Sequence, residues 1–279
     1  MRSRIIAITV VAMSLVVVAG YLVARVLDIP FRALITSCEV AGESTVRLDP
    51  EQLANAATIT AVGVRRGLPA RAVVVALATA MQESELRNLA GGDRDSIGLF
   101  QQRPSQGWGE PEQIRDPRYA AGMFYDHLVQ VEGWEQMRVT DAAQAVQRSA
   151  FPEAYQQWAD DAEILATALI GQRPGAVSCT LTDPHTNSGD ATNGLMEALR
   201  LDWGEITVEP TSDAAGVVIP ADDNQSGWRY AHWLVSHAEE QGVVAVRFDG
   251  QEWRADEGNW QPVDDATTDS VLAEVFTSD

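Results

Sequence analysis

One carboxylate stands at the end of a long uncharged segment, and this segment constrains the fold more than any other part of the chain. Eleven uncharged residues, Ala72 to Gln82, precede Glu83, and a stretch rich in Gly and Asp follows it. The segment is largely apolar on all sides at helical spacing, which predicts a central, buried helix over residues 68–88. A lone acid near the end of such a helix has surroundings that raise a carboxyl pKa and suit it to donate a proton. From spacing alone, solvated charges at a helix terminus are the simpler interpretation of Glu83 and Glu85.

The charge of the chain is unevenly distributed. Its 279 residues include 40 acids and 20 Arg but no Lys, for a formal net charge of −20. Residues 1–182 carry 20 acids and 16 Arg, a net of −4, whereas residues 183–279 carry 20 acids and 4 Arg, a net of −16. This shift predicts a domain boundary near residue 183. The acidity also argues against nucleic-acid binding, because phosphate would be repelled.

The N-terminal region predicts export. Ile5 to Ala24 is a run of twenty uncharged residues, long enough to cross a hydrocarbon core as a helix. We expect residues 1–27 to be an uncleaved single-pass anchor with the N-terminus inside, and residues 28–48 to be a stalk. A cleaved signal peptide ending near Val18-Ala19-Gly20 is the alternative, and the protein would then be secreted. In both cases the bulk of the chain is extracytoplasmic.

Residues 49–182 have the pattern of a compact helical domain without strands. Helix starts are expected at Asp49-Pro50, Asp116-Pro117 and Phe151-Pro152, where a capping residue or Pro opens an apolar stripe. The last of these helices is expected to run from Phe151-Pro152 through Tyr155 to Leu169. Gly67 and Gly171 are expected to end helices.

The remainder of the chain predicts a small α/β accessory domain over residues 183–263. It comprises a helix over 193–201, a strand over 205–208, a polar linker over 210–226, a helix through Trp228, and two strands joined by Asp249-Gly250. Residues 264–279 are expected to be a frayed acidic tail. The predicted fold class is therefore mainly α, with a small C-terminal α/β module.

Cys38 and Cys179 are the only two cysteines, and they bracket the predicted helical domain. In an oxidising compartment, a disulfide closing so long a loop is expected to stabilise the fold by about 4–5 kcal/mol in the chain-entropy model. Two unrelated buried thiols are the alternative. The predicted export favours the disulfide.

Three motifs in order resemble the lysozyme-like domain shared by lytic transglycosylases and goose-type lysozymes. Glu83-Ser84 matches a Glu-Ser pair that ends the central helix of that family, and Gly98-Leu99-Phe100-Gln101 matches its Gly-Leu-Met-Gln motif. Asp116-Pro117, with Gly122, Phe124 and Tyr125, matches a later motif. The run DRDSIGLFQQRPSQGWG is typical of a variant branch in high-GC Gram-positive bacteria.

This resemblance implies a lysozyme-like helical domain and makes Glu83 the catalytic acid and base. The expected activity is cleavage of the β-1,4 bond between N-acetylmuramic acid and N-acetylglucosamine in peptidoglycan glycan strands. The family usually carries Ala-Tyr-Asn-Ala-Gly in a later helix, with the Tyr beside the catalytic Glu. Here the nearest match is Ala145 to Ser149, so that Tyr is absent, and Gln147 is expected to supply the amide of the Asn.

Two outcomes of the reaction stay open at the level of sequence. As in lytic transglycosylases, Glu83 alone would form an anhydro product. If instead Asp93 or Asp95 positions a water, as loop acids do in goose-type enzymes, the product is an ordinary reducing sugar. A non-catalytic wall-binding or scaffold subunit of a cell-envelope secretion or conjugation machine is the alternative from another class.

The remaining site residues follow from the motifs and from residue type. Trp108 between two glycines is either a sugar-stacking residue or a core residue beneath a loop. The expected substrate-binding set comprises Ser84, Gly98, Phe100, Gln101, Gln102, Trp108 and Gln147. The four His residues lack metal-ligand spacing, so neither metal nor cofactor is expected. The Trp residues of the C-terminal module are expected in its core, with contact to a cell-envelope partner as the alternative.

Overall fold

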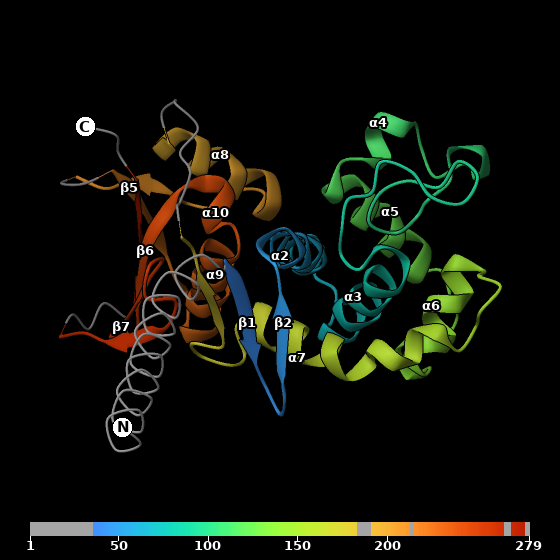
Figure 1. Cartoon of the computed structure of the whole chain (residues 1–279), viewed down its shortest axis with the longest axis horizontal. Coiled ribbons are helices and arrows are strands. Elements are labelled where there is room, and N and C mark those ends of the chain that lie inside the picture. The colour runs from blue at the N-terminus through green and yellow to red at the C-terminus, as the bar shows by residue number, and fades with distance from the viewer. Residues whose placement is uncertain (1–35, 183–190, 213–214, 265–268, 277–279) are drawn as a thin grey trace, which may run out of the picture. The chain divides into compact units, whose positions relative to one another are not determined.

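In the part of the chain that the structure describes, helices are the commonest element, and strands form two separate antiparallel sheets (Figure 1). This computed structural model describes residues 36–182, 191–212, 215–264 and 269–276. The α-helices are α2 (Pro50–Arg65), α3 (Ala70–Ser84), α4 (Pro111–Ile114), α5 (Pro117–Leu128), α6 (Val139–Gln147), α7 (Ala159–Leu169), α8 (Ala191–Trp203), α9 (Asn224–Ser236) and α10 (Ala238–Gln241). Three short 3₁₀ helices are η1 (Pro104–Gln106), η2 (Trp134–Gln136) and η3 (Ala154–Trp158).

The sheets contradict the predicted fold class. One sheet has three strands in the order β2-β1-β3, and the other has six in the order β4-β5-β9-β6-β7-β8. A mainly α fold with a small α/β module is therefore wrong. The strands are β1 (Ser37–Ala41), β2 (Thr45–Leu48), β3 (Val177–Thr180), β4 (Glu209–Pro210), β5 (Gly216–Pro220), β6 (Val243–Phe248), β7 (Gln251–Arg254), β8 (Trp260–Pro262) and β9 (Ser270–Val275).

The three-stranded sheet lies where a stalk and a strand-free helical domain were predicted. β1 and β2 form a hairpin, and β1 also pairs with β3, which lies at the far end of the helical region. Cys38 and Val40 of β1 are buried and alternate with exposed residues, the period of a half-buried strand. That pattern is too short to identify a strand without its distant partner.

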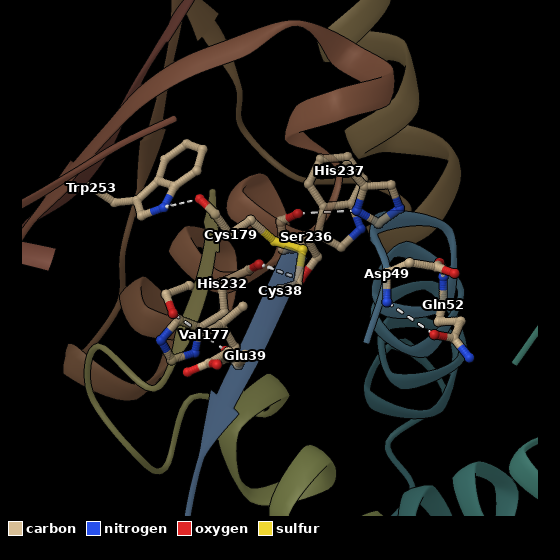
Figure 2. Close-up of a disulfide and its surroundings, with 12 residues drawn as sticks. Cys38, Glu39, Asp49, Gln52, Val177, Cys179, His232, Ser236, His237 and Trp253 are labelled. Atoms are coloured by element: carbon tan, nitrogen blue, oxygen red, sulfur yellow. Dashed lines mark hydrogen bonds between the residues drawn. A yellow bond between two sulfur atoms is a disulfide. The ribbon is translucent and has the colours of Figure 1, made fainter. Parts of the chain in front are cut away.

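The predicted disulfide between Cys38 and Cys179 is present. The two residues lie directly opposite each other in the β1–β3 pair, with Cα atoms 4.0 Å apart. Figure 2 shows the bond bridging the two strands, with the indole of Trp253 donating a hydrogen bond to the Cys179 carbonyl at 3.1 Å. The bond therefore joins the start of the helical region to its end.

The six-stranded sheet contradicts three predictions about the C-terminal region. β9 pairs with both β5 and β6, so the predicted frayed tail contains a central strand. Val271, Ala273 and Val275 are the buried positions of that strand. β5 falls inside the predicted linker, and residues 205–208 form no strand. The hairpin through Asp249-Gly250 and the two helices of this region are confirmed.

The central helices follow the sequence pattern closely. Every residue of α3 from Ala72 to Met81 is buried, as predicted for a central helix. α2 begins with an Asp49 cap in which Asp49 and Gln52 exchange hydrogen bonds, visible in Figure 2, and Pro50 opens the helix. α2 packs against α3 on one side and against α9 on the other. α9 in turn packs on β6 and β9.

A buried carboxylate connects α2, α5, α8 and α9. Asp202 of α8 is fully buried, and its Oδ2 accepts hydrogen bonds from Thr58 at 2.8 Å and from the indole of Trp233 at 2.7 Å. Arg118 of α5 forms an ion pair with Oδ1, at 2.6 Å from its Nε. Buried charges of this kind are stable only when paired and hydrogen-bonded. The four helices are therefore held at one shared point.

The predicted N-terminal membrane helix, Ile5 to Ala24, lies outside the described residues. Within the described part of the chain, no helix has the length and apolar character needed to cross a bilayer. The domain boundary predicted near residue 183 also lies outside the described residues and stays a prediction. Contacts group the residues from Ser37 onwards into one unit.

Candidate active site

Glu83 lies in the last turn of α3, where the helix stops earlier than predicted. The helix ends at Ser84 rather than near Asn88, because Glu85 and Leu86 adopt left-handed backbone conformations with φ of 54° and 60°. Two side chains of α2 satisfy the carbonyls that this ending exposes: Gln52 donates to Glu85 O at 2.9 Å and Asn55 to Leu86 O at 2.8 Å. A neighbouring helix therefore fixes the end of α3 and the position of Glu83.

Tyr155 is the principal partner of Glu83. Its hydroxyl donates a hydrogen bond to Glu83 Oε1 at 2.6 Å. Sequence reasoning placed Tyr155 on one face of a continuous helix starting at Phe151-Pro152, whereas it lies on η3, and α7 begins only at Ala159. A phenol therefore contacts Glu83, and it comes from η3 rather than from the segment Ala145 to Ser149.

The rest of η3 also binds the end of α3. Gln157 Nε2 and the indole nitrogen of Trp158 both donate to Gln82 Oε1, each at 2.9 Å. η3 therefore contacts two consecutive side chains of α3, Gln82 and Glu83. This double attachment fixes the direction of the Tyr155 hydroxyl.

Gln147 joins Glu83 to the loop that follows α3. At the C-terminal end of α6, its Nε2 donates to Phe100 O at 2.8 Å, and its side chain also hydrogen-bonds Glu83. The expectation that Gln147 supplies an amide beside the carboxyl group is consistent with this geometry. The side chain lies where α6, the loop and α3 meet.

The surroundings of Glu83 raise its pKa above the ordinary value of 4.5. Burial is the largest cause, since a half-buried carboxylate loses hydration. Hydrogen bonds from Tyr155 and Gln147 favour the ionised form and lower the pKa, but their effect is smaller. The carboxyl group therefore keeps its proton to higher pH than a solvated Glu.

The two loop acids are engaged elsewhere. Asp95 accepts hydrogen bonds from the Ser105 amide and from Arg103 Nε, each at 2.8 Å. Hydrogen bonding by the Ser105 side chain, then by the Ser105 amide and by Arg103, holds the pKa of Asp95 far below the usual range. The Asp93 side chain is 92% exposed, and its recorded partner is Arg94 at 3.9 Å. Among the described residues, no hydrogen bond or ion pair joins either Asp to Glu83.

Several predicted substrate-binding residues instead build the loop beneath the site. The Ser84 hydroxyl is buried and donates to Leu99 O at 2.7 Å, which fastens the loop to the helix. Phe100 is fully buried and stacks on Phe124 with ring centroids 4.8 Å apart. Gly98 has a φ of 77°, and a side chain there would meet the carbonyl of Ile114 at 2.9 Å.

The two Gln residues of the motif are likewise tied to backbone. Gln101 donates to Gly98 O at 3.1 Å, and Gln102 is buried and donates to Ala120 O at 3.0 Å. A side chain on Gly92 would collide with the Gln101 amide, which explains the glycine at that position. These contacts make the motif a support for the site rather than its lining.

A cavity of about 610 Å³ adjoins Glu83 through Gln147. It is lined by Gln106, Trp108, His127, Gln130, Val131, Ala145, Val146, Gln147 and Arg148. Trp108 contributes to the wall but is only 9% exposed, and the ring of His127 covers it at a centroid distance of 4.2 Å. The cavity is mostly polar, with side-chain amides from η1, from α6 and from the turn after α5.

Neither the protein-family models nor the curated proteins contain a match to this chain.

Metal binding is not indicated by the residues that the structure describes, since no group of three or more His, Cys, Asp or Glu side chains could hold an ion there. The end of α3 presents a carboxyl group with two hydrogen-bond donors. This arrangement supports proton transfer to and from a bound molecule.

Sequence reasoning missed Tyr155 and four of the cavity residues. The four are Gln106, His127, Gln130 and Arg148. One available signal was the acidic pair Asp160-Asp161, which marks the first turn of α7 and hence a break after Trp158. The cavity residues had no signal of their own, because they come from separate elements that meet only in the fold.

Proposed function

We propose that this protein is a lytic transglycosylase that cleaves the β-1,4 bond between N-acetylmuramic acid and N-acetylglucosamine in peptidoglycan strands. The observation that carries the proposal is Glu83, a half-buried carboxyl group with a raised pKa beside a polar cavity of about 610 Å³. Glycosidic cleavage needs such an acid to protonate the leaving oxygen. The three sequence motifs point to the same residue.

In the first step, neutral Glu83 protonates the glycosidic oxygen as the bond to the muramoyl C1 breaks. Tyr155 and Gln147 both donate hydrogen bonds to the carboxyl group, so its proton is not committed to a protein acceptor. The same donors stabilise the carboxylate that remains after transfer. The leaving sugar departs with a new hydroxyl group.

In the second step, the Glu83 carboxylate removes the proton of the muramoyl C6 hydroxyl, whose oxygen then bonds to C1. The product is a 1,6-anhydro ring, and Glu83 is again protonated. This route needs no second carboxylate, which agrees with the engagement of Asp95 by Arg103 and Ser105. Hydrolysis through a water held by Asp93 or Asp95 has no comparable support.

Tyr155 also bears on the non-catalytic alternative. Absence of the family Tyr was one of two reasons to consider a wall-binding or scaffold subunit, the other being the acidic C-terminal region. A phenol now lies 2.6 Å from Glu83 on another element, so the first reason no longer applies. Trp228, Trp233 and Trp253 are fully buried, which removes them as a binding surface of the C-terminal region.

The disulfide supports an extracytoplasmic location, where peptidoglycan is found. Structural disulfides persist in oxidising compartments and are rare in reducing cytosol. Cys38 and Cys179 are buried and bonded to each other. Residues 37–180 are therefore proposed to fold outside the cytoplasm.

Digestion of purified sacculi by the full chain, with mass analysis of the released muropeptides, tests the proposal. The wild-type protein is expected to release fragments with 1,6-anhydro ends. Glu83→Gln is expected to lower the rate by at least about 100-fold, because general acid catalysis is lost. Glu85→Gln is the matched control: its side chain is exposed two residues away, and its rate is expected to be unchanged.

Folding of the inactive variant is checked by thermal unfolding. The stability that neutral Glu83 provides is present below pH 4.5 and is lost as pH rises through its raised pKa. Gln is neutral at all pH, so Glu83→Gln is expected to be at least as stable as wild type at pH 7. Equal activity of Glu83→Gln and wild type would refute the assignment, and reducing ends would show hydrolysis instead.

A further inference from the structure

We propose that the cavity beside Glu83 contains a carboxylate-binding subsite, with Arg148 as its cation. The inference rests on the proposed function and specifies the substrate further. The ligand group is a carboxylate carried by the muramoyl residue, either on its lactyl ether or on the stem peptide attached there. The enzyme would then distinguish peptidoglycan from neutral glycans of the same backbone.

Arg148 occupies a fixed position at the cavity wall. It follows Gln147 directly, ends α6 with a left-handed backbone (φ 54°), and its amide donates to Gln144 O at 2.9 Å. Gln147 hydrogen-bonds Glu83, so the guanidinium belongs to the residue next to one that contacts the acid. An anion bound by Arg148 would therefore lie close to the bond being cleaved.

Arg148 has no protein counter-ion in the described part of the chain. Most arginines there are engaged by acids, as Arg66 is by Asp126, Arg103 by Asp95 and Arg138 by both Asp141 and Glu153. Within the described ranges, neither a hydrogen bond nor an ion pair is recorded for the Arg148 guanidinium. Arg65 and Arg71 also lack an acidic partner in that part of the chain, but their guanidinium groups donate to the backbone carbonyls of Leu201 and Met137.

The cavity itself carries no carboxylate among its lining residues. Three Gln amides, an indole, an imidazole and aliphatic groups surround Arg148. The imidazole is held with its Nδ1 against the Met123 carbonyl at 2.8 Å, which leaves Nε2 free of that contact. The side chain of Arg148 is exposed, and no carboxylate of the cavity lining balances its positive charge, so it can attract an anion to the cavity.

A second cavity offers a contrast. Arg173 lines a cavity of about 470 Å³ together with Glu43, Asp160 and Glu163. Three carboxylates outweigh the single cation there, so this cavity does not favour an anion. Arg173 is therefore a matched control for the loss of one arginine from a cavity.

The test measures glycan binding on the inactive Glu83→Gln background, so that no ligand is consumed. Three probes are compared: a neutral chitin oligosaccharide, glycan strands stripped by an amidase so that only the lactyl carboxylate remains, and strands with intact stem peptides. The affinity of each probe is measured for Glu83→Gln alone and for double variants that also carry Arg148→Gln, Arg148→Lys or Arg173→Gln. Thermal unfolding of every variant confirms that it is folded.

Arg148→Gln is expected to weaken binding of the carboxylate-bearing strands about tenfold or more, since it removes a charge-assisted hydrogen bond. Binding of the neutral oligosaccharide is expected to be unchanged. Arg148→Lys should restore part of the loss, because a point charge lacks the forked geometry. Arg173→Gln should have no effect on any probe.

Each outcome separates the inference from the proposed function. Loss with intact strands alone identifies a stem-peptide carboxylate. Loss with stripped strands alone identifies the lactyl carboxylate, which is an amide in intact strands, and loss with both means that the subsite accepts either group. If Arg148→Gln weakens the binding of neutral and anionic glycans equally, or of neither, the proposed subsite is refuted and the proposed function stands. Absence of binding to all three probes by the parent overturns the proposed function, and the subsite with it.

Discussion

At the scale of single residues, burial and hydrogen bonding act on Glu83 in opposite directions. Burial favours the neutral acid that the first step needs, and the Tyr155 and Gln147 donors favour the carboxylate that the second step needs. A carboxyl group with both influences can change protonation state twice in one cycle. The balance is set by only two neighbouring side chains.

Removal of one donor should shift this balance measurably. The hydrogen bond from Tyr155 to Glu83, 2.6 Å long, lowers the pKa of Glu83. Tyr155→Phe keeps the ring but removes this bond. That pKa is therefore expected to rise further, and the alkaline limb of the cleavage rate should move to higher pH. The maximal rate should fall about tenfold, as expected for loss of a hydrogen bond to a charged group.

Tyr230→Phe is the control for this change, because Tyr230 lies on α9 and packs against Trp203. Its pH profile should match that of the wild-type protein. An unaltered profile in Tyr155→Phe as well would mean that the phenol does not act on Glu83 in solution.

Glu83 was predictable from sequence and Tyr155 was not. A lone acid after eleven uncharged residues is a local pattern, and its position depends on one helix. The direction of Tyr155 depends on where η3, which ends at Trp158, gives way to α7, which begins at Ala159. Side-chain contacts between distant elements leave no comparable trace in spacing.

At the scale of elements, the predictions from sequence were wrong about where α3 ends and about short strands. α3 ends early because Gln52 and Asn55 of α2 bind the carbonyls beyond it, and such tertiary caps have no local signature. β1 and β9 are short and flanked by polar residues, so their sequences were interpreted as part of a stalk and part of a frayed tail. Their partners, β3 for β1 and β5 and β6 for β9, are distant in sequence and decide that they are strands.

The disulfide between β1 and β3 is expected to stabilise the fold because it restricts the conformations of the unfolded chain. Its sequence separation is 141 residues, so the double variant Cys38→Ser, Cys179→Ser frees a long loop in the denatured state. Its free energy of unfolding is expected to fall by about 4–5 kcal/mol in the chain-entropy model. Urea unfolding of the oxidised protein and the double variant measures the difference.

Reduced wild-type protein serves as a second comparison and should unfold like the double variant. If all three proteins share one urea midpoint, the bond contributes nothing to stability. Because both sulfurs are buried, reduction is expected to need partial unfolding first.

At the scale of the whole molecule, a buried imidazole joins α9 to α7 and to the segment before β3. His232 of α9 is fully buried: its Nδ1 lies 2.8 Å from Ala168 O, and its Nε2 accepts a hydrogen bond from the Ala176 amide at 3.2 Å. Both bonds require the neutral ring with its proton on Nδ1. His237 is buried as well, and burial lowers its pKa too.

The free energy of unfolding is therefore expected to fall in acid, because His232 becomes protonated. Burial lowers the pKa of His232 from 6.5 to about 4, so its neutral form stabilises the native state above pH 6.5. This contribution is lost as pH falls from 6.5 towards 4, and it amounts to about 3 kcal/mol. Urea unfolding at pH 4 to 7 should show the decline.

The comparison with His232→Gln isolates this residue from the other groups that titrate in the same range. The variant is expected to be less stable at pH 7 and to lose less stability on acidification. Parallel pH curves for wild type and His232→Gln would exclude His232 as a source of the acid sensitivity.

The placement of the disulfide has a mechanical consequence. Cys38 and Cys179 are opposed in adjacent strands, so residues 39–178 form a closed covalent loop. Tension applied between the chain before β1 and the chain after β3 would pass through the sulfur–sulfur bond and bypass this loop. Glu83, Tyr155 and the cavity all lie within it. Pulling on the two flanks by single-molecule force spectroscopy would extend the oxidised chain without stretching the loop that contains Glu83 and the cavity. That loop would unfold under tension only after reduction.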